Sequence, residues 1–186
     1  MTAMQYAELQ VTTNYSFLRS GSHPGELVFQ AANLGYYAIG VADRNTLAGV
    51  VRAYSAVREY YEETAIPEES WIKLLVGARL ETIDGYSLLA YPMNIEGYKR
   101  LSLLLSKGNE HAAKGECKLT FELLAEYADH ILAFVLRRGT SKILSSMRSC
   151  AGSPASIVAA AISPPPCCSV ATMRRAWPTS TISRRR

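Results

Sequence analysis

The 186-residue sequence is poor in the residue types on which several classes of protein depend. It has only three histidines and four cysteines, and Cys150, Cys167 and Cys168 have no histidine near them, so it predicts neither a zinc site nor a disulfide framework. No apolar stretch reaches the roughly 18 residues that a membrane span needs, and no basic region followed by an apolar run opens the chain as a signal peptide does. We therefore expect a cytoplasmic protein that has no membrane partner.

Acidic residues are absent from the last part of the chain. Residues 1–136 carry all 16 Asp and Glu against 11 Lys and Arg, whereas residues 137–186 carry nine Lys and Arg and no acid. The same stretch holds ten serines and five of the eight prolines, with no sustained helical or strand spacing. We interpret residues 137–186 as a low-complexity basic tail that is either disordered or read in a shifted frame. Its arginines, Arg184–Arg186 among them, would contact phosphates only nonspecifically.

Residues 5–136, in contrast, contain a regular alternation of strand-like and helix-like segments. Strand patterns cover residues 6–12, 38–42, 74–81, 86–91 and 131–136, and helical patterns begin near Pro24, Thr46, Asn94 and Thr120. Asp84 and Gly85 join the third and fourth strands in the manner of a hairpin turn. This order predicts an α/β domain whose parallel strands present their carboxyl ends on one face.

Two groups of polar residues occupy strand ends, where α/β folds place functional side chains. Glu8 and Gln10 stand two apart on the first strand, so both point to one face, as two ligands of one metal ion would. The polar face of a half-buried strand explains the same pair, and these residues alone favour that interpretation. Asp43 follows a buried strand and precedes a helix, where it would either reach a ligand or, like Asn45, cap the helix.

The order and spacing of five blocks resemble a known family. The blocks are residues 8–27, 43–49, 75–80, 87–92 with Gly97-Tyr98, and 114–120. Together they resemble the polymerase and histidinol phosphatase (PHP) domain, and more closely the version at the N-terminus of error-prone C-family DNA polymerases, which are similar to the DNA polymerase III alpha subunit. The resemblance covers roughly residues 5–136 and implies part of a distorted (β/α)7 barrel.

In active PHP domains the resemblance implies up to three metal ions that hydrolyse phosphoesters, held by His and carboxylate ligands at the strand ends. This sequence departs from that pattern. Glu8 and Gln10 stand where active members have His-x-His, Arg44 replaces the His after the second-strand Asp, and Arg79 replaces a third-strand Glu. The His that opens the fourth strand falls at about Gly85, and Asp43 alone matches a ligand outright. We therefore expect that the PHP metals are lost and that this chain needs no cofactor.

Arginine stays protonated and repels a metal ion, so Arg44 and Arg79 need another explanation. One hypothesis is that they fill the space of the ions and pair with Glu8 and Asp43, in which case Arg79→Ala would cost roughly 3 to 5 kcal/mol. The alternative is that both arginines point into solvent.

Three functions of different class follow from this sequence. The first is a non-catalytic structural module of an error-prone DNA polymerase, whose replication and damage-tolerant repair synthesis would use DNA, the rest of the polymerase and two magnesium ions in a separate palm domain. The second is a stand-alone metal-dependent phosphoesterase. The third is a gene remnant, favoured by the tail and by strands too few to close a barrel. A barrel that is not closed would leave its first and fifth strands as exposed sheet edges.

Overall fold

The computed structural model describes residues 5–64, 66–67, 70–110 and 112–136. Along them the element order is β1 (Ala7–Val11), α1 (Pro24–Asn33), β2 (Ala38–Arg44), α2 (Ala48–Thr64), β3 (Lys73–Glu81), β4 (Ser87–Pro92), α3 (Ile95–Glu110), α4 (Phe121–Glu126) and β5 (Ile131–Val135). The interpretation of residues 137–186 as a basic tail concerns residues outside the described part of the chain. The predicted mixture of strands and helices over residues 5–136 is confirmed.

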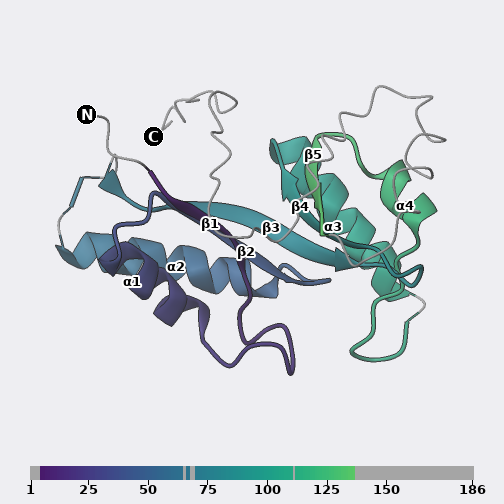
Figure 1. The fold of residues 1–186 in the computed structure, drawn as a ribbon, viewed down its shortest axis with the longest axis horizontal. Helices are drawn as coiled ribbons and strands as arrows, with labels where there is room; N and C mark the ends of the chain where they lie inside the picture. The colour runs from purple at the N-terminus through teal and green to yellow at the C-terminus, as the bar shows by residue number, and fades with distance from the viewer. Residues whose placement is uncertain (1–4, 65, 68–69, 111, 137–186) are drawn as a thin grey trace, which may run out of the picture.

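The strands form one five-stranded sheet in the order β1-β2-β3-β4-β5, with helices packed along it (Figure 1). β1, β2 and β3 run parallel, whereas β4 is antiparallel to both β3 and β5. The hairpin predicted between β3 and β4 is therefore confirmed, and β4 is not one of the parallel strands. Gly85 has φ of +85°, which glycine adopts readily, and the Thr82 N–H donates to the Tyr86 carbonyl at 2.9 Å across a turn too short for a crossover.

Side-chain alternation divides the sheet into two faces. Ile39, Val41 and Leu80 point toward the helices, where two apolar clusters fill the space under α1 with α2 and under α3 with α4. The other face carries a smaller cluster that includes Ala42, Leu89, Tyr91 and Phe134. Arg44 stands two residues after Ala42 and so belongs to this second face, at the carboxyl end of β2.

Two of the helix starts follow from single capping residues. The Thr120 hydroxyl accepts a hydrogen bond from the Leu123 N–H (3.2 Å), and the Asn94 side chain accepts one from the Gly97 N–H (2.9 Å). Both contacts satisfy backbone donors that the first turn leaves without a partner, as the sequence predicts. They stabilise the first turns of α4 and α3.

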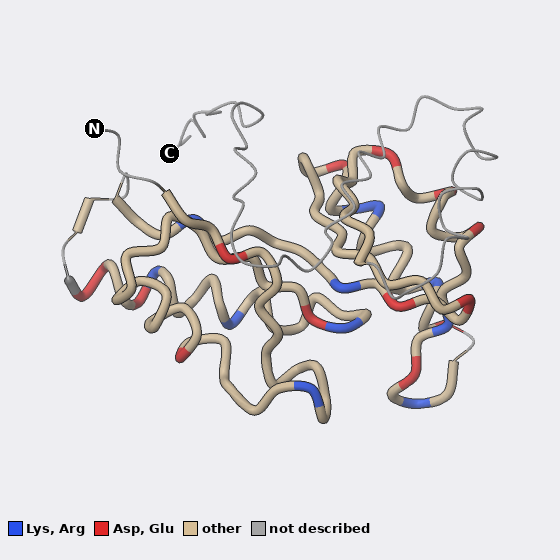
Figure 2. Tube along the Cα trace, viewed as in Figure 1, with Lys and Arg blue, Asp and Glu red and all other residues tan. Residues whose placement is uncertain are grey.

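No helix among the described residues is long and apolar enough to cross a membrane. Figure 2 shows Lys and Arg positions mixed with Asp and Glu positions along the described trace, although β1, α1 and α4 carry acidic residues alone.

Candidate functional site

The carboxyl ends of β1, β2 and β3 meet beside the loop between β1 and α1, and Asp43, Arg44 and Arg79 lie at this end of the sheet. Asp43 is the most deeply buried charged residue among them, with 1% of its surface exposed. Its Oδ1 atom accepts hydrogen bonds from the Thr13 N–H and the Ser16 hydroxyl, both at 2.7 Å. Its Oδ2 atom accepts a third from the Thr13 hydroxyl, also at 2.7 Å. Asp43 therefore holds the β1–α1 loop against the end of β2.

Ser16 extends this connection to the next residue of the strand. Its hydroxyl oxygen accepts a hydrogen bond from the Arg44 N–H at 2.9 Å while its proton goes to Asp43. Gly49, at the start of α2, leaves room for the same contacts, because an added Cβ would lie 2.4 Å from Asp43 Oδ2 and 2.8 Å from Thr13 Oγ1. The sequence therefore brings together a strand end, a loop and a helix start around one buried carboxylate.

Neither Asp43 nor Asn45 caps α2, so that interpretation is wrong. The backbone N–H of Ala48 takes the Thr46 hydroxyl as its acceptor instead. Asn45 adopts a left-handed φ of +51°, which asparagine tolerates better than most residues. From there its amide group accepts from the Glu81 N–H at 2.8 Å and donates to the Glu81 carbonyl at 3.2 Å, which ties the end of β2 to the end of β3.

Glu8 and Gln10 do not join this end of the sheet as a ligand pair. The pairing of β1 with β2 shifts register between Glu8 and Val11, which interrupts the alternation that would have put both side chains on one face. The Glu8 carboxylate accepts from the Tyr6 hydroxyl at 2.7 Å and from the Gln10 N–H at 3.0 Å. The hydrogen bond to Glu8 raises the pKa of Tyr6 to about 12. The Glu8 carboxylate therefore accepts hydrogen bonds from residues next to it in the sequence.

Arg44 and Arg79 lie side by side, because they are register partners on β2 and β3. Neighbouring strands are about 4.8 Å apart, so two like charges at this position repel unless a counter-charge is near. Glu81 supplies it: its carboxylate lies 2.7 Å from Arg44 Nε and 3.3 Å from Arg79 Nε. A third arginine, Arg19 from the β1–α1 loop, approaches the same carboxylate at 3.4 Å.

The hypothesis that Arg44 and Arg79 pair with Glu8 and Asp43 is thus wrong in its partners. Glu81 stands two residues after Arg79 and therefore on the same face of β3, whereas the Asp43 carboxylate accepts from Thr13 and Ser16 instead of an arginine. The solvent alternative holds in part for Arg44, whose side chain is 48% exposed, whereas that of Arg79 is 24% exposed, and both guanidinium groups also form ion pairs with Glu81. Sequence analysis missed Glu81, although strand alternation from Arg79 points to it, and missed Arg19, for which no local pattern gives a signal.

Thr12, Arg19, Arg44, Arg79 and Glu81 line a pocket of about 230 Å³, which we call the arginine pocket. Its lining carries three guanidinium groups and one carboxylate, and therefore a formal charge of +2. Among the described residues, no three His, Cys, Asp or Glu side chains lie close enough together to hold a metal ion. The residues at this end of the sheet do not fit the metal cluster that the PHP resemblance implies for active members.

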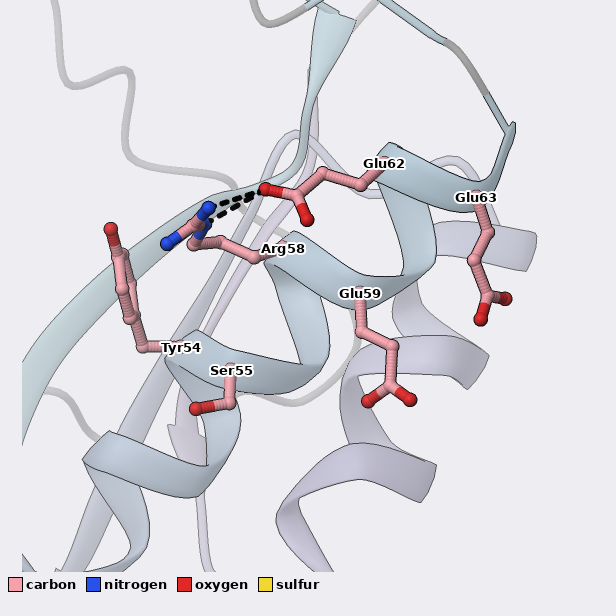
Figure 3. Close-up of a pocket in the computed structure, with 6 residues that line it drawn as sticks. All are labelled: Tyr54, Ser55, Arg58, Glu59, Glu62 and Glu63. Atoms are coloured by element: carbon pink, nitrogen blue, oxygen red, sulfur yellow. Dashed lines mark hydrogen bonds and ion pairs between the residues drawn. The ribbon is translucent and has the colours of Figure 1, made fainter.

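A larger hollow of about 580 Å³ lies on α2, but the side chains that line it do not converge as those of a binding site do. Its six lining residues, which all come from that one helix, are Tyr54, Ser55, Arg58, Glu59, Glu62 and Glu63. Figure 3 shows Arg58 and Glu62 paired on one side of the helix, while Glu59 and Glu63 extend on the other. Because these groups do not converge, we assign no chemistry to this hollow.

The remaining candidates make structural contacts. His23 precedes α1, and its backbone N–H donates to Glu26 at 3.0 Å, which agrees with the predicted helix start. The His130 ring lies 3.2 Å from the Asn94 amide nitrogen, and His111 is outside the described residues. Burial raises the pKa of the Cys117 thiol, which keeps it in the unreactive protonated form.

Comparison with known proteins places this geometry in a family. Residues 8–161 match the PHP domain. An error-prone DNA polymerase of Rhodopseudomonas palustris (strain HaA2) is 57% identical over 122 residues, which make up 65% of this chain and 10% of the relative. The error-prone DNA polymerase 1 of Agrobacterium fabrum is 43% identical over 150 residues, or 74% of this chain and 13% of the relative.

A third relative, the error-prone DNA polymerase of Caulobacter vibrioides, is 45% identical over 132 residues, or 70% of this chain and 11% of the relative. The chain thus spans about a tenth of the length of the curated relatives it matches. Among solved structures, a proposed metal-dependent phosphoesterase of Bifidobacterium adolescentis matches 56% of this chain and 33% of its own, with 24% identity and a TM-score of 0.42. On the match over residues 8–161, the chain belongs to the PHP domain family.

Proposed function

We propose that this chain is the PHP portion of an error-prone DNA polymerase and that it acts there as a structural module without phosphoesterase activity. The observation that carries the proposal is the occupation of the strand ends by Arg44, Arg79 and their shared partner Glu81. The first part of the proposal is supported by relatives that are 43% to 57% identical and are named error-prone DNA polymerases.

The donor set at the strand ends argues against metal-dependent hydrolysis. A guanidinium group cannot ligate a metal ion and repels one, and here two of them lie at neighbouring strand ends. Asp43 is the one residue that matches a ligand in the resemblance, but both of its carboxylate oxygens already accept hydrogen bonds from Thr13 and Ser16. Three of the roughly four lone-pair positions of the Asp43 carboxylate are thus already taken by Thr13 and Ser16.

The structural role follows from the shape of the sheet. We infer that its five sequential strands are part of the (β/α)7 barrel of the family, with β1 and β5 as the edge strands among the described residues. Edge strands carry backbone groups free to pair with further strands or with a partner. The partner we propose is the rest of the polymerase, which would also bring the DNA, the magnesium ions of polymerisation and a role in replication and repair after DNA damage.

The location and the tail belong to the same proposal. A polymerase module would work in the cytoplasm of a bacterial cell, where the DNA lies. The basic tail of residues 137–186, outside the described residues, would add only nonspecific phosphate contacts.

A hydrolysis assay tests the absence of catalysis. Purified chain is incubated with p-nitrophenyl phosphate in the presence of Mn²⁺, Zn²⁺ or EDTA, and release of p-nitrophenol is followed. We expect the rate to equal that of the buffer with each metal. Metal-dependent hydrolysis that co-purifies with the chain and falls in an Asp43→Asn variant would contradict the proposal and favour a stand-alone phosphoesterase.

Soluble expression and cooperative unfolding by urea test the structural part. A chain that shows no cooperative transition would favour a gene remnant over a module. Sequencing of the coding DNA across residues 130–145 then shows whether another frame continues the α/β pattern.

A further inference from the structure

We propose that the arginine pocket binds a phosphate group through Arg44 and Arg79 without a metal ion. This inference goes beyond the structural role proposed above, because it gives the strand ends a ligand. It starts from charge: one carboxylate, that of Glu81, faces three guanidinium groups from three different elements. The pocket therefore has an unbalanced formal charge of +2, which an anion would neutralise.

The hydrogen-bonding groups of the two arginines are arranged for such a ligand. Arg44 contacts Glu81 through Nε, and Arg79 contacts Glu81 and the Ser87 hydroxyl through Nε. Within the described residues, the terminal nitrogens of Arg44 and Arg79 make no further ion pair or hydrogen bond. Each guanidinium thus keeps its terminal N–H groups for an acceptor, and two such groups form the fork that matches phosphate oxygens.

The protein holds these two side chains in advance of binding. Register pairing of β2 with β3 puts Arg44 and Arg79 on the same face, and Glu81 fixes both Nε atoms. Side chains that are already ordered lose less conformational entropy when a ligand arrives. Since a water molecule occupies about 30 Å³ in the liquid, the pocket of about 230 Å³ accommodates one phosphate group together with several waters.

Phosphate is a better match than a carboxylate ligand for reasons of charge. A phosphate dianion would balance the +2 of the lining in full, whereas a single carboxylate would leave half of it. The hydroxyl of Thr12 adds a neutral donor on the pocket wall. The phosphate has two possible sources: a free phosphate group, which carries up to two negative charges, or the backbone of a DNA strand, whose phosphodiester carries one and presents two non-bridging oxygens to the arginines.

Titration calorimetry of the whole chain with inorganic phosphate tests the proposal, in buffer with EDTA and with ionic strength held constant by sodium chloride. Arg44→Gln and Arg79→Gln are each expected to weaken phosphate binding by about tenfold or more, as loss of a charged hydrogen bond does. The matched control is Arg52→Gln, which makes the same charge change at an exposed position of α2 outside the pocket and is expected to leave binding unchanged.

Glu81→Gln provides a second test that keeps both arginines. The substitution raises the formal charge of the pocket lining from +2 to +3, which is expected to tighten phosphate binding several-fold. The proposal would be overturned if the parent chain and Glu81→Gln are both folded and neither binds phosphate. It would also be overturned if Arg52→Gln weakens phosphate binding as much as Arg44→Gln and Arg79→Gln do.

Anisotropy of a short fluorescein-labelled oligothymidylate separates the two sources. Binding that inorganic phosphate displaces and that Arg44→Gln weakens supports a DNA phosphate, and phosphate binding without oligothymidylate binding supports a free phosphate group. Phosphate binding that disappears in EDTA would overturn both the arginine site and the metal-free role. Absence of phosphate binding by a chain that also lacks metal would overturn this inference alone.

Discussion

Replacement of Asp43 distinguishes a structural carboxylate from a metal ligand. In the structure the Asp43 carboxylate is buried and accepts three hydrogen bonds from Thr13 and Ser16. Asp43→Ala removes both acceptor oxygens and with them all three hydrogen bonds. The Thr13 N–H suffers most, because a backbone donor cannot turn toward another acceptor as a hydroxyl can.

The expected cost follows from these contacts. A buried donor left without a partner costs about 1 to 3 kcal/mol, and the two hydroxyls add part of the same cost each. We therefore expect Asp43→Ala to lower the free energy of unfolding by about 2 to 4 kcal/mol, a large share of the roughly 5 to 15 kcal/mol of a typical domain. Asp43→Asn keeps one oxygen for the Thr13 N–H, and its expected cost is about 1 kcal/mol.

Urea unfolding followed by far-ultraviolet circular dichroism measures both variants, with EDTA present throughout. A structural carboxylate destabilises the chain on removal even when no metal can bind. Equal unfolding free energies for Asp43→Ala and the parent in EDTA would refute the reasoning. The reasoning would also be refuted if EDTA lowered the unfolding free energy of the parent chain by as much as Asp43→Ala does.

Three further predictions rest on other contacts. Gly49→Ala is expected to cost about 1 to 3 kcal/mol, since its Cβ would lie 2.4 Å from a buried carboxylate oxygen, whereas Gly21→Ala, with no atom within 4 Å, is the matched control in urea unfolding. Arg79→Ala is expected to cost no more than about 1 kcal/mol, because Glu81 keeps two other arginine partners; a loss of more than twice that in thermal unfolding would show that Arg79 is individually essential. Burial, and then the charge of a nearby glutamate, raises the pKa of Tyr91 above its ordinary value of 10.0, so the folded state holds its proton more tightly and stability falls as the pH rises above about 10. Unfolding of Tyr91→Phe, which cannot ionise, is expected to depend less on pH in that range; an unchanged dependence would contradict the assignment.

Much of the fold could be predicted from local patterns. Alternation of apolar residues gave the strands, and Asn94 and Thr120 marked helix starts because their side chains satisfy local backbone donors. The direction of β4 was implicit in Asp84 and Gly85, since a turn that short forces the chain to reverse. These features depend on contacts between residues close together in the chain, and such contacts can be predicted from one sequence.

The site was only partly predictable, because its contacts join distant segments. Asp43 was recognised as a special position, but its partners Thr13 and Ser16 lie about 30 residues away in a loop whose path no local pattern sets. Arg44 and Arg79 were recognised as substitutions that exclude a metal, but their partner was assigned wrongly. Strand alternation places Glu81 on the same face as Arg79, so this partner could have been predicted. The register shift near Glu8 leaves no signal in the sequence.

The central claim is that the strand ends of this PHP domain hold arginines in place of metal ions, and metal content tests it most directly. The chain is purified without chelator, dialysed, and measured for manganese, iron and zinc by inductively coupled plasma mass spectrometry. The control is the variant with Arg44→His and Arg79→Glu, which puts the ligand types of active members back at these two strand ends. We predict far less than one bound ion per parent chain, whereas one or more ions per chain that are lost on Asp43→Asn would contradict the account.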